Sequence, residues 1–126
     1  MAVAKDRVVE RQAEIFKAIA HPVRLKIVQY LGYYGEQAVS DIVKAVGAEQ
    51  SSVSRHLSLF KQAGVMQWRK QGLKVYYRLA NPELAECIER IGTCVRGMVN
   101  GQLEPGDSMP AEAGAPPGMG RAVSGV

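Results

Sequence analysis

A short stretch rich in hydroxyl and basic side chains has residue types and spacing that suggest a specific chemistry. Residues 50–60 read QSSVSRHLSLF, and Val53, Leu57 and Phe60 recur at helical spacing, so they form one apolar stripe. The other face carries serines and Arg55 but no carboxylate. Small hydroxyl groups let a helix approach a phosphate backbone closely, and Arg, Ser and Gln can bond the edges of bases. The pattern therefore predicts a helix that contacts DNA.

The distribution of charge also favours a polyanionic partner. The chain has 126 residues and a formal net charge of +4. Residues 50–80 contain six Lys or Arg residues and no Asp or Glu, so this window alone carries +6. A block of one sign inside a folded unit is typical of nucleic-acid binding. A merely solvated basic face is the alternative, but the aromatic and hydroxyl side chains in the same window argue against it.

Catalysis is disfavoured by the same residues. Ser54 and His56 are two positions apart on a helix, so their side chains point in different directions. A nucleophile requires a base and a group that orients the base, and residues 50–80 offer no acid for that purpose. We therefore expect no enzyme activity. His56 borders the apolar stripe, where either a phosphate contact or a hydrogen bond to the backbone is compatible with its position.

Cys87 and Cys94 form the second informative pair. They lie seven residues apart in one predicted helix, which places them about 10 Å apart along its axis. A disulfide requires Cα atoms within roughly 7 Å, so the two thiols can join only between two copies of the chain. Two interpretations stay open: small apolar residues in a helix seam, or a thiol sensor that is oxidised or binds a soft metal or metalloid. We identify no other metal site and no certain cofactor.

The elements that must position these residues follow from the apolar spacing. Helices are predicted over residues 7–20, 22–31, 39–46, 50–63 and 82–98. Strands are predicted over 65–70 and 73–79, with Gln71-Gly72 as the turn between them. Gly32 and Gly35 are expected to bracket another turn. A short turn before a polar, basic helix, followed by a hairpin, predicts a mostly α-helical winged helix-turn-helix with a small β-hairpin wing, in the order α-α-α-α-β-β-α.

Two of the predicted helices carry apolar stripes. The stripe of the first helix consists of Val8, Ile15, Phe16 and Ile19. The stripe of the last helix consists of Leu84, Cys87, Ile88, Ile91, Val95 and Met98. Both helices therefore have a side suited to packing against other helices.

Composition divides the chain into three parts. Residues 1–6 are expected to be flexible, residues 7–100 to form one domain, and residues 101–126, with six Gly and four Pro, to be a disordered tail. No run of about 18 apolar residues suggests a membrane span. The first residues lack the apolar core of a signal peptide, and two cysteines make no disulfide framework. We expect a cytoplasmic protein that does not associate with membranes.

Four motifs together resemble the ArsR/SmtB family of small winged-helix repressors. They are AHPVRLKI (20–27), SVSRHL (52–57), AGV (63–65) and GLKVYYRL (72–79). The resemblance extends over about residues 7–98. It implies a homodimer built largely from the first and last helices, a palindromic operator in double-stranded DNA as the binding partner, and release when an effector binds. Residues 7–100 would then be both the DNA-binding and the dimerisation domain.

The resemblance also implies a set of contact residues. On the recognition helix these are Gln50, Ser51, Ser52, Ser54, Arg55 and His56. On the wing they are Lys70, Gln71, Gly72 and Lys74. Glu49 stands where the family often has a serine, which removes a favoured helix cap.

The effector sites of the family are not matched. The Cys-Val-Cys of arsenic-sensing members corresponds here to Ala38-Val39-Ser40. The positions of zinc-sensing members look like Asn81, Glu83, Cys94 and Gly97, of which only two could bind a metal, too few for a good Zn²⁺ site. An effector would therefore act near Cys87 and Cys94. A constitutive DNA-binding regulator without an effector and a winged-helix protein-interaction module are the alternatives.

Overall fold

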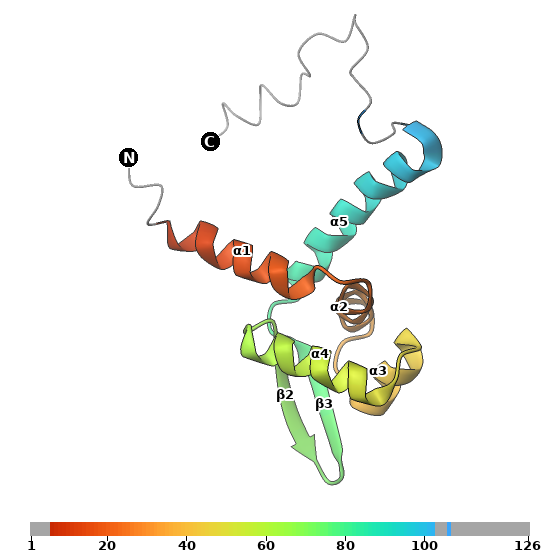
Figure 1. The fold of residues 1–126 in the computed structure, drawn as a ribbon. Helices are drawn as coiled ribbons and strands as arrows, with labels where there is room; N and C mark the ends of the chain where they lie inside the picture. Colours follow the sequence, from red (N-terminus) through yellow and green to blue (C-terminus); the bar gives the residue numbers. More distant parts are fainter. Residues whose placement is uncertain (1–5, 103–105, 107–126) are drawn as a thin grey trace, which may run out of the picture. The chain divides into compact units, whose positions relative to one another are not determined.

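The computed structural model describes residues 6–102 and residue 106 (Figure 1). The chain divides into two compact units, residues 1–92 and 93–126, and the boundary lies within the last helix. In chain order the elements are α1 (Arg7–Ile19), α2 (Pro22–Tyr34), β1 (Gln37–Ala38), α3 (Val39–Val46), α4 (Gln50–Gln62), β2 (Met66–Gln71), β3 (Lys74–Leu79), α5 (Glu83–Gly97) and the short π-helix η2 (Met98–Gln102). The predicted order is confirmed, with β1 added to it. Among the described residues, no helix is long and apolar enough to cross a membrane.

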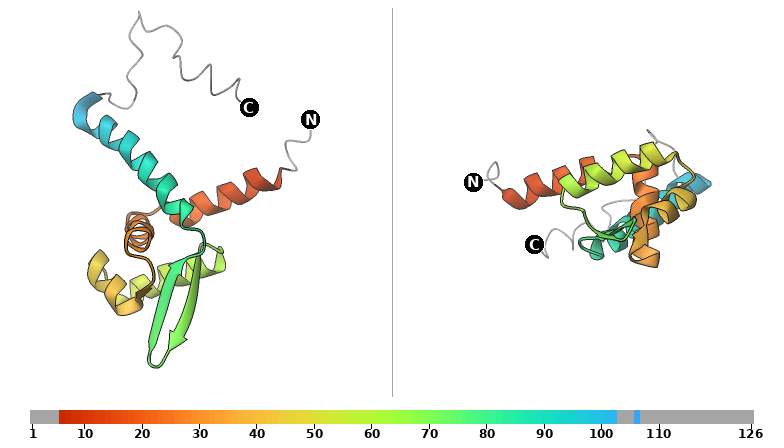
Figure 2. Two further views of the ribbon diagram at one scale, coloured as in Figure 1. Left: turned by 180° about the vertical axis from the view of Figure 1, so that it is seen from behind. Right: turned by 90° about the horizontal axis from the view of Figure 1, so that it is seen from below.

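The helix-turn-helix and the wing occupy neighbouring parts of the first unit. α3 begins and ends at the predicted residues, and Gly47 (φ 68°) ends it in the left-handed conformation, with its N–H donating to the carbonyl of Val43. α4 packs against α3 and against β2. The β2–β3 hairpin extends beyond α4, away from α1 and α2, as the views from the front and from behind show (Figures 1 and 2).

The wing belongs to a three-stranded antiparallel sheet in the order β1-β3-β2. The sequence prediction of its turn was wrong by one residue, because Gln71 pairs with Lys74 and the loop is therefore Gly72-Leu73. Gly72 has φ 63°, as the first loop position of a type II′ hairpin turn requires. Leu73 lies at the tip and is 100% exposed.

The end of α2 differs from expectation. Tyr33 and Tyr34 continue the helix, although we expected them in a turn, and the N–H of Gly35 closes it by donating to the carbonyl of Leu31 at 2.8 Å. Gly32 does not break the helix because tertiary packing outweighs its weak helix propensity. A Cβ atom at Gly32 would lie 2.3 Å from the Cβ of Ala85 on α5. Gly32 therefore permits a close approach of two helices.

Replacing Gly32 with alanine tests this packing role. A helical Gly→Ala change would normally stabilise the protein, but here the added methyl group overlaps Ala85. We expect Gly32→Ala to lower the free energy of unfolding by about 1–3 kcal/mol in urea denaturation. Ala85→Gly in the same chain should restore part of the loss. An unchanged or increased stability of the single variant would contradict the close packing.

The hydrophobic core lies between the helices and the inner face of the sheet. Val53, Leu57 and Phe60 are each 0% exposed, which confirms the predicted stripe of α4. The other fully buried large side chains are Ile27, Val28 and Ile42. On β3, Tyr77 and Leu79 are buried and Lys74 and Arg78 are exposed, as predicted, whereas Val75 and Tyr76 are both half-buried. The core therefore fixes which face of α4 is turned towards solvent.

The apolar stripes of α1 and α5 are largely exposed. Ile19 is the buried residue of α1, and Ile88 is the buried residue of α5. The exposed large apolar residues on α1, α5 and η2 are Val8, Val9, Phe16, Ile91, Val95, Met98 and Val99. Packing among the described residues thus leaves most of these stripes uncovered.

The chain ends fall mostly outside the described residues. Asp6, which we placed in the flexible N-terminus, is the N-cap of α1, because its carboxylate accepts hydrogen bonds from the N–H groups of Val8 (3.0 Å) and Val9 (3.3 Å). The rest of the predicted flexible segment 1–6 lies outside the described residues. The predicted tail 101–126 also lies outside them, apart from residues 101, 102 and 106.

Candidate nucleic-acid interface

α4 is anchored by its apolar side and presents its polar side to solvent. The side chains of that polar side, exposed or half-buried, are Gln50, Ser51, Ser52, Ser54, Arg55 and His56. Glu49 occupies the N-cap position and makes no side-chain hydrogen bond to the helix, in line with the missing serine. The position of α4 therefore depends on its buried stripe and on contacts from other elements.

The tip of the wing is also exposed and basic. The wing residues expected from the sequence, all exposed, are Lys70, Gln71, Gly72 and Lys74. They lie in or beside the two-residue loop of the hairpin. Because residues 50–80 contain no carboxylate, the polar face of α4 and the wing tip attract anions together.

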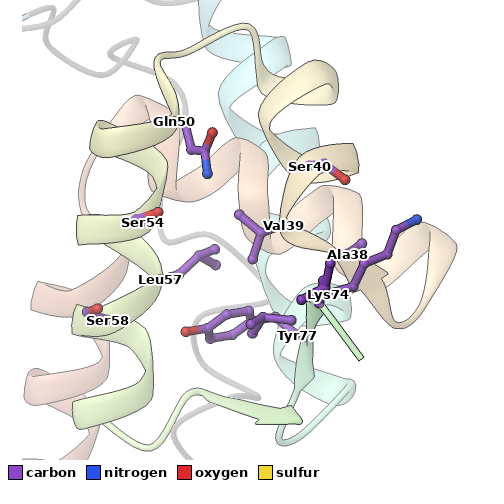
Figure 3. A pocket seen from close by; sticks show the side chains of 11 residues that line it. Ala38, Val39, Ser40, Gln50, Ser54, Leu57, Ser58, Lys74 and Tyr77 are labelled. Carbon is purple, nitrogen blue, oxygen red and sulfur yellow. The ribbon is translucent and has the colours of Figure 1, made fainter. Parts of the chain in front are cut away.

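A cleft separates α4 from the wing and the start of α3 (Figure 3). Its volume is about 390 Å³, with Gln50 and Ser54 on the α4 side and Lys74 on the wing side. Leu57 and Tyr77 lie between the two walls. Burial raises the pKa of Tyr77, so its hydroxyl stays protonated. The structure thus brings part of the predicted helix set and part of the wing set to one cleft.

The middle of the wing contains an ion pair that the local sequence does not reveal. Arg69 on β2 donates from Nε and Nη2 to the two carboxylate oxygens of Glu36, each at 2.8 Å. The same guanidinium donates to Gln71 and lies 4.6 Å from the centre of the Tyr76 ring. The hydrogen bond from Arg69 holds the pKa of Glu36 below its usual range. One of the six positive charges of the window is therefore neutralised by a residue outside it.

His56 lies at the side of α4 that faces the start of α2. Its Nδ1 accepts a hydrogen bond from Nε of Arg24 at 3.0 Å, and its ring centre lies 4.7 Å from that of His21. One of the two sequence interpretations placed a hydrogen bond to the backbone here, whereas the partner is a side chain. Burial, followed by the charge of Arg24, lowers the pKa of His56, which favours the neutral ring.

Comparison with known proteins identifies the family. The model of the bacterial regulatory proteins of the arsR family matches residues 21–67. The transcriptional repressor PagR of Bacillus anthracis is 38% identical over 80 residues, which cover 64% of this chain and 80% of PagR. The crystal structure of PagR gives a TM-score of 0.60, with 36% identity, over 67% of this chain and 95% of that chain. The chain belongs to the ArsR family.

Two further relatives agree with this assignment. The arsenical resistance operon repressor of Escherichia coli is 42% identical over 67 residues, which cover 53% of this chain and 57% of the repressor. A homodimeric winged helix-turn-helix DNA-binding domain of Mycobacterium bovis, described as a possible ArsR-family regulator, has a TM-score of 0.66 and 28% identity over 82% of this chain and 98% of that domain. Membership of the ArsR family makes this chain a DNA-binding transcriptional regulator and not an enzyme.

The thiols of this ArsR-family chain are available for chemistry. Cys87 and Cys94 are both exposed and not disulfide-bonded. Within the part of the chain that the structure describes, no group of three or more His, Cys, Asp or Glu side chains is arranged to hold a metal ion. A metal bound by one copy through these thiols would therefore lack the four ligands of a closed site.

Sequence reasoning missed two residues that support the interface. Glu36 precedes β1 and gives no local signal, because its partner Arg69 is 33 residues away. Arg24 falls in the AHPVRLKI motif, so its occurrence in a family motif was a signal that it has a role. Neither contact follows from periodicity, since each joins elements that are distant in the chain.

Proposed function

We propose that this ArsR-family protein is a homodimeric repressor that binds a palindromic operator. Each α4 would enter a major groove, with half-sites about one DNA turn apart, and each wing would contact the adjacent backbone. The observation that carries the proposal is the exposed, carboxylate-free face of α4 beside the basic wing tip.

The contact residues divide by chemistry. Gln50 and Arg55 can bond base edges, and the serines can bond phosphates or bases. Lys70 and Lys74 are exposed point charges suited to phosphate oxygens. Gly72 allows the wing tip to approach the backbone, and Gln71 adds a polar amide beside it. The recognition helix would therefore supply specificity, and the wing mainly affinity.

The exposed apolar stripes support a homodimer. Val8 on α1 is 74% exposed and Val99, after α5, is 76% exposed. A group of exposed large apolar side chains usually marks a surface that binds another molecule. A twofold dimer also fits an operator with two equivalent half-sites. The dimer interface would be formed by α1 and α5.

Selection of DNA from a random-sequence pool tests the proposed function. The protein should enrich a palindromic duplex, bind it as a dimer by light scattering, and lose about a thousandfold in affinity between 50 and 200 mM salt if six phosphate contacts form. Failure to enrich any duplex, together with salt-independent retention of a protein partner, would instead make this domain a protein-interaction module.

We further propose that a thiol effector acts through Cys87 and Cys94. Both thiols are exposed on α5, the helix that carries one of the two apolar stripes. Oxidation, or a soft metalloid bridging thiols of two copies, would change how the α5 helices pack. A shift between dimer arrangements could then separate the two recognition helices from their half-sites.

Replacement of both cysteines by serine tests this effector. We expect oxidant, polysulfide or arsenite to reduce the affinity of the parent protein for the selected duplex at least tenfold, while Zn²⁺ has little effect. The Cys87→Ser, Cys94→Ser variant should bind as tightly as the reduced parent in every condition, measured by fluorescence anisotropy. Equal responses of the two proteins would remove the thiol effector and favour constitutive binding.

A further inference from the structure

Side chains at the start of α2 and just before it contact α4 and fix one another. Arg24 donates from Nε to Nδ1 of His56 at 3.0 Å, and from Nη1 to the carbonyl of Ala18 in the last turn of α1 at 3.3 Å. Arg24 therefore touches α1 and α4 at once. At the C-terminal end of α4, Arg11 of α1 donates to the carbonyl of Ala63. Contacts from α1 and α2 thus hold α4 at two points.

His21 completes the cluster. Its Nδ1 accepts the N–H of Val23 at 3.0 Å, so its ring is fixed as the N-cap of α2. The fixed ring lies 4.7 Å from the His56 ring, at an interplanar angle of 48°. His56 is therefore confined by a hydrogen bond on one side and by a ring contact on another.

The hydrogen bond from Arg24 determines the protonation of His56. A guanidinium can only donate, so Nδ1 of His56 must be unprotonated, and a neutral imidazole then carries its proton on Nε2. Nε2 has no partner among the described residues. No buried side-chain nitrogen or oxygen within those residues lacks a partner, so Nε2 is not fully buried in the half-buried His56 side chain. The ring therefore presents an uncharged N–H donor from the recognition helix.

We propose that Arg24 is a positioning residue that locks His56 in the Nε2–H tautomer, so that Nε2 donates to a phosphate of the operator backbone. The proposal rests on the proposed function, in which α4 is the recognition helix. The groups that act on His56 are Arg24 from α2, His21 before α2 and Arg55 on α4, and all three oppose its protonation. Protonation of Nδ1 of His56 would place its N–H against the Nε–H of Arg24, and the hydrogen bond between the two side chains would be lost.

The tautomer can be measured without DNA. In the free parent protein, the ¹⁵N shifts of His56 should show an unprotonated Nδ1 and a protonated Nε2. Arg24→Gln should give a mixture of tautomers and a higher pKa of His56, because a cation that opposes protonation is removed. A protonated Nδ1 or a mixture in the parent would overturn the proposal. This readout stands even if the protein binds no operator.

Binding of the selected duplex tests the phosphate contact. His56→Asn replaces Nδ1 with an amide oxygen that can still accept from Arg24, but it lacks the Nε2–H donor. The variant should lose about 10- to 100-fold in affinity with little change in stability. Arg24→Gln should lose a similar factor, and the double variant should lose no more than either single one, because both remove the same contact. Lys26→Gln removes an equal charge from an exposed position of α2 and should change affinity less than about threefold.

Each outcome decides between the possibilities. Losses that multiply in the double variant, or an Arg24→Gln affinity equal to that of Lys26→Gln, would overturn the positioning role. Should Arg24→Gln fail to fold, the tautomer of the parent and the affinity of His56→Asn decide the proposal by themselves. A parent that enriches no duplex would refute the proposed function, while the measured tautomer would still test the action of Arg24 on His56.

Discussion

Arg55→Ala is expected to weaken binding of the selected operator duplex by about 10- to 100-fold and to reduce its preference over a random duplex. Arg55 is exposed on the polar face of α4, and a guanidinium can donate two parallel hydrogen bonds to a guanine edge. Loss of that contact removes both affinity and discrimination. Fluorescence anisotropy with the two duplexes at one salt concentration measures both quantities.

Lys74→Ala is the matched control for Arg55→Ala. Lys74 is exposed on the wing, so its loss should weaken binding to both duplexes by the same factor and lower the magnitude of the salt slope by about 2, because the dimer loses one phosphate contact from each copy. An Arg55→Ala variant that behaves in this uniform way would show that Arg55 contacts only the backbone. Wild-type binding by both variants would mean that α4 and the wing are not the interface.

Phe60→Ala is expected to lower the free energy of unfolding by about 3–5 kcal/mol. Phe60 is 0% exposed and belongs to the core shared by the helices and the sheet, so the truncated side chain would leave a cavity in that core. Domains of this size have a total stability of about 5–15 kcal/mol, so much of it would be lost. Urea denaturation followed by circular dichroism measures the change.

Leu59→Ala provides the comparison for Phe60→Ala. Leu59 is the preceding residue on α4 but is 43% exposed, so its truncation should change stability by less than about 1 kcal/mol. Equal losses in the two variants would contradict the burial pattern of α4. A stable Phe60→Ala protein with the affinity of the parent would mean that the position of α4 does not depend on this core residue.

The described contacts also separate two parts of the wing. In the middle of the hairpin, Arg69 is bound to Glu36 and lies near the Tyr76 ring, so its charge is neutralised within the fold. At the tip, Lys70 and Lys74 remain exposed. A hairpin tied to Glu36 through Arg69, with exposed lysines at its tip, would be suited to following a DNA backbone, because the lysine side chains stay free to reach phosphates.

Much of the fold could be predicted from the sequence because its signals are local. The apolar stripe of α4, the stop at Gly47 and the alternation along β3 each depend on residues within a few positions of one another. The polar face of α4 was predicted in the same way, since the buried stripe fixes the opposite side. Family motifs then supplied the wing residues, and the structure places them at an exposed hairpin tip.

Tertiary structure alone decided the features that join distant residues. β1 is two residues long and forms only because β3 lies beside it. α2 continues past Gly32, where Ala85 of α5 packs closely against the helix. The partner of Arg69 lies outside the basic window, and the partner of His56 lies on another helix. The sequence by itself determined which residues form the polar face of α4 and the basic hairpin. The tertiary contacts decided which of those side chains are bound within the fold and which stay exposed, since a hydrogen bond between distant residues leaves no periodic pattern in the chain.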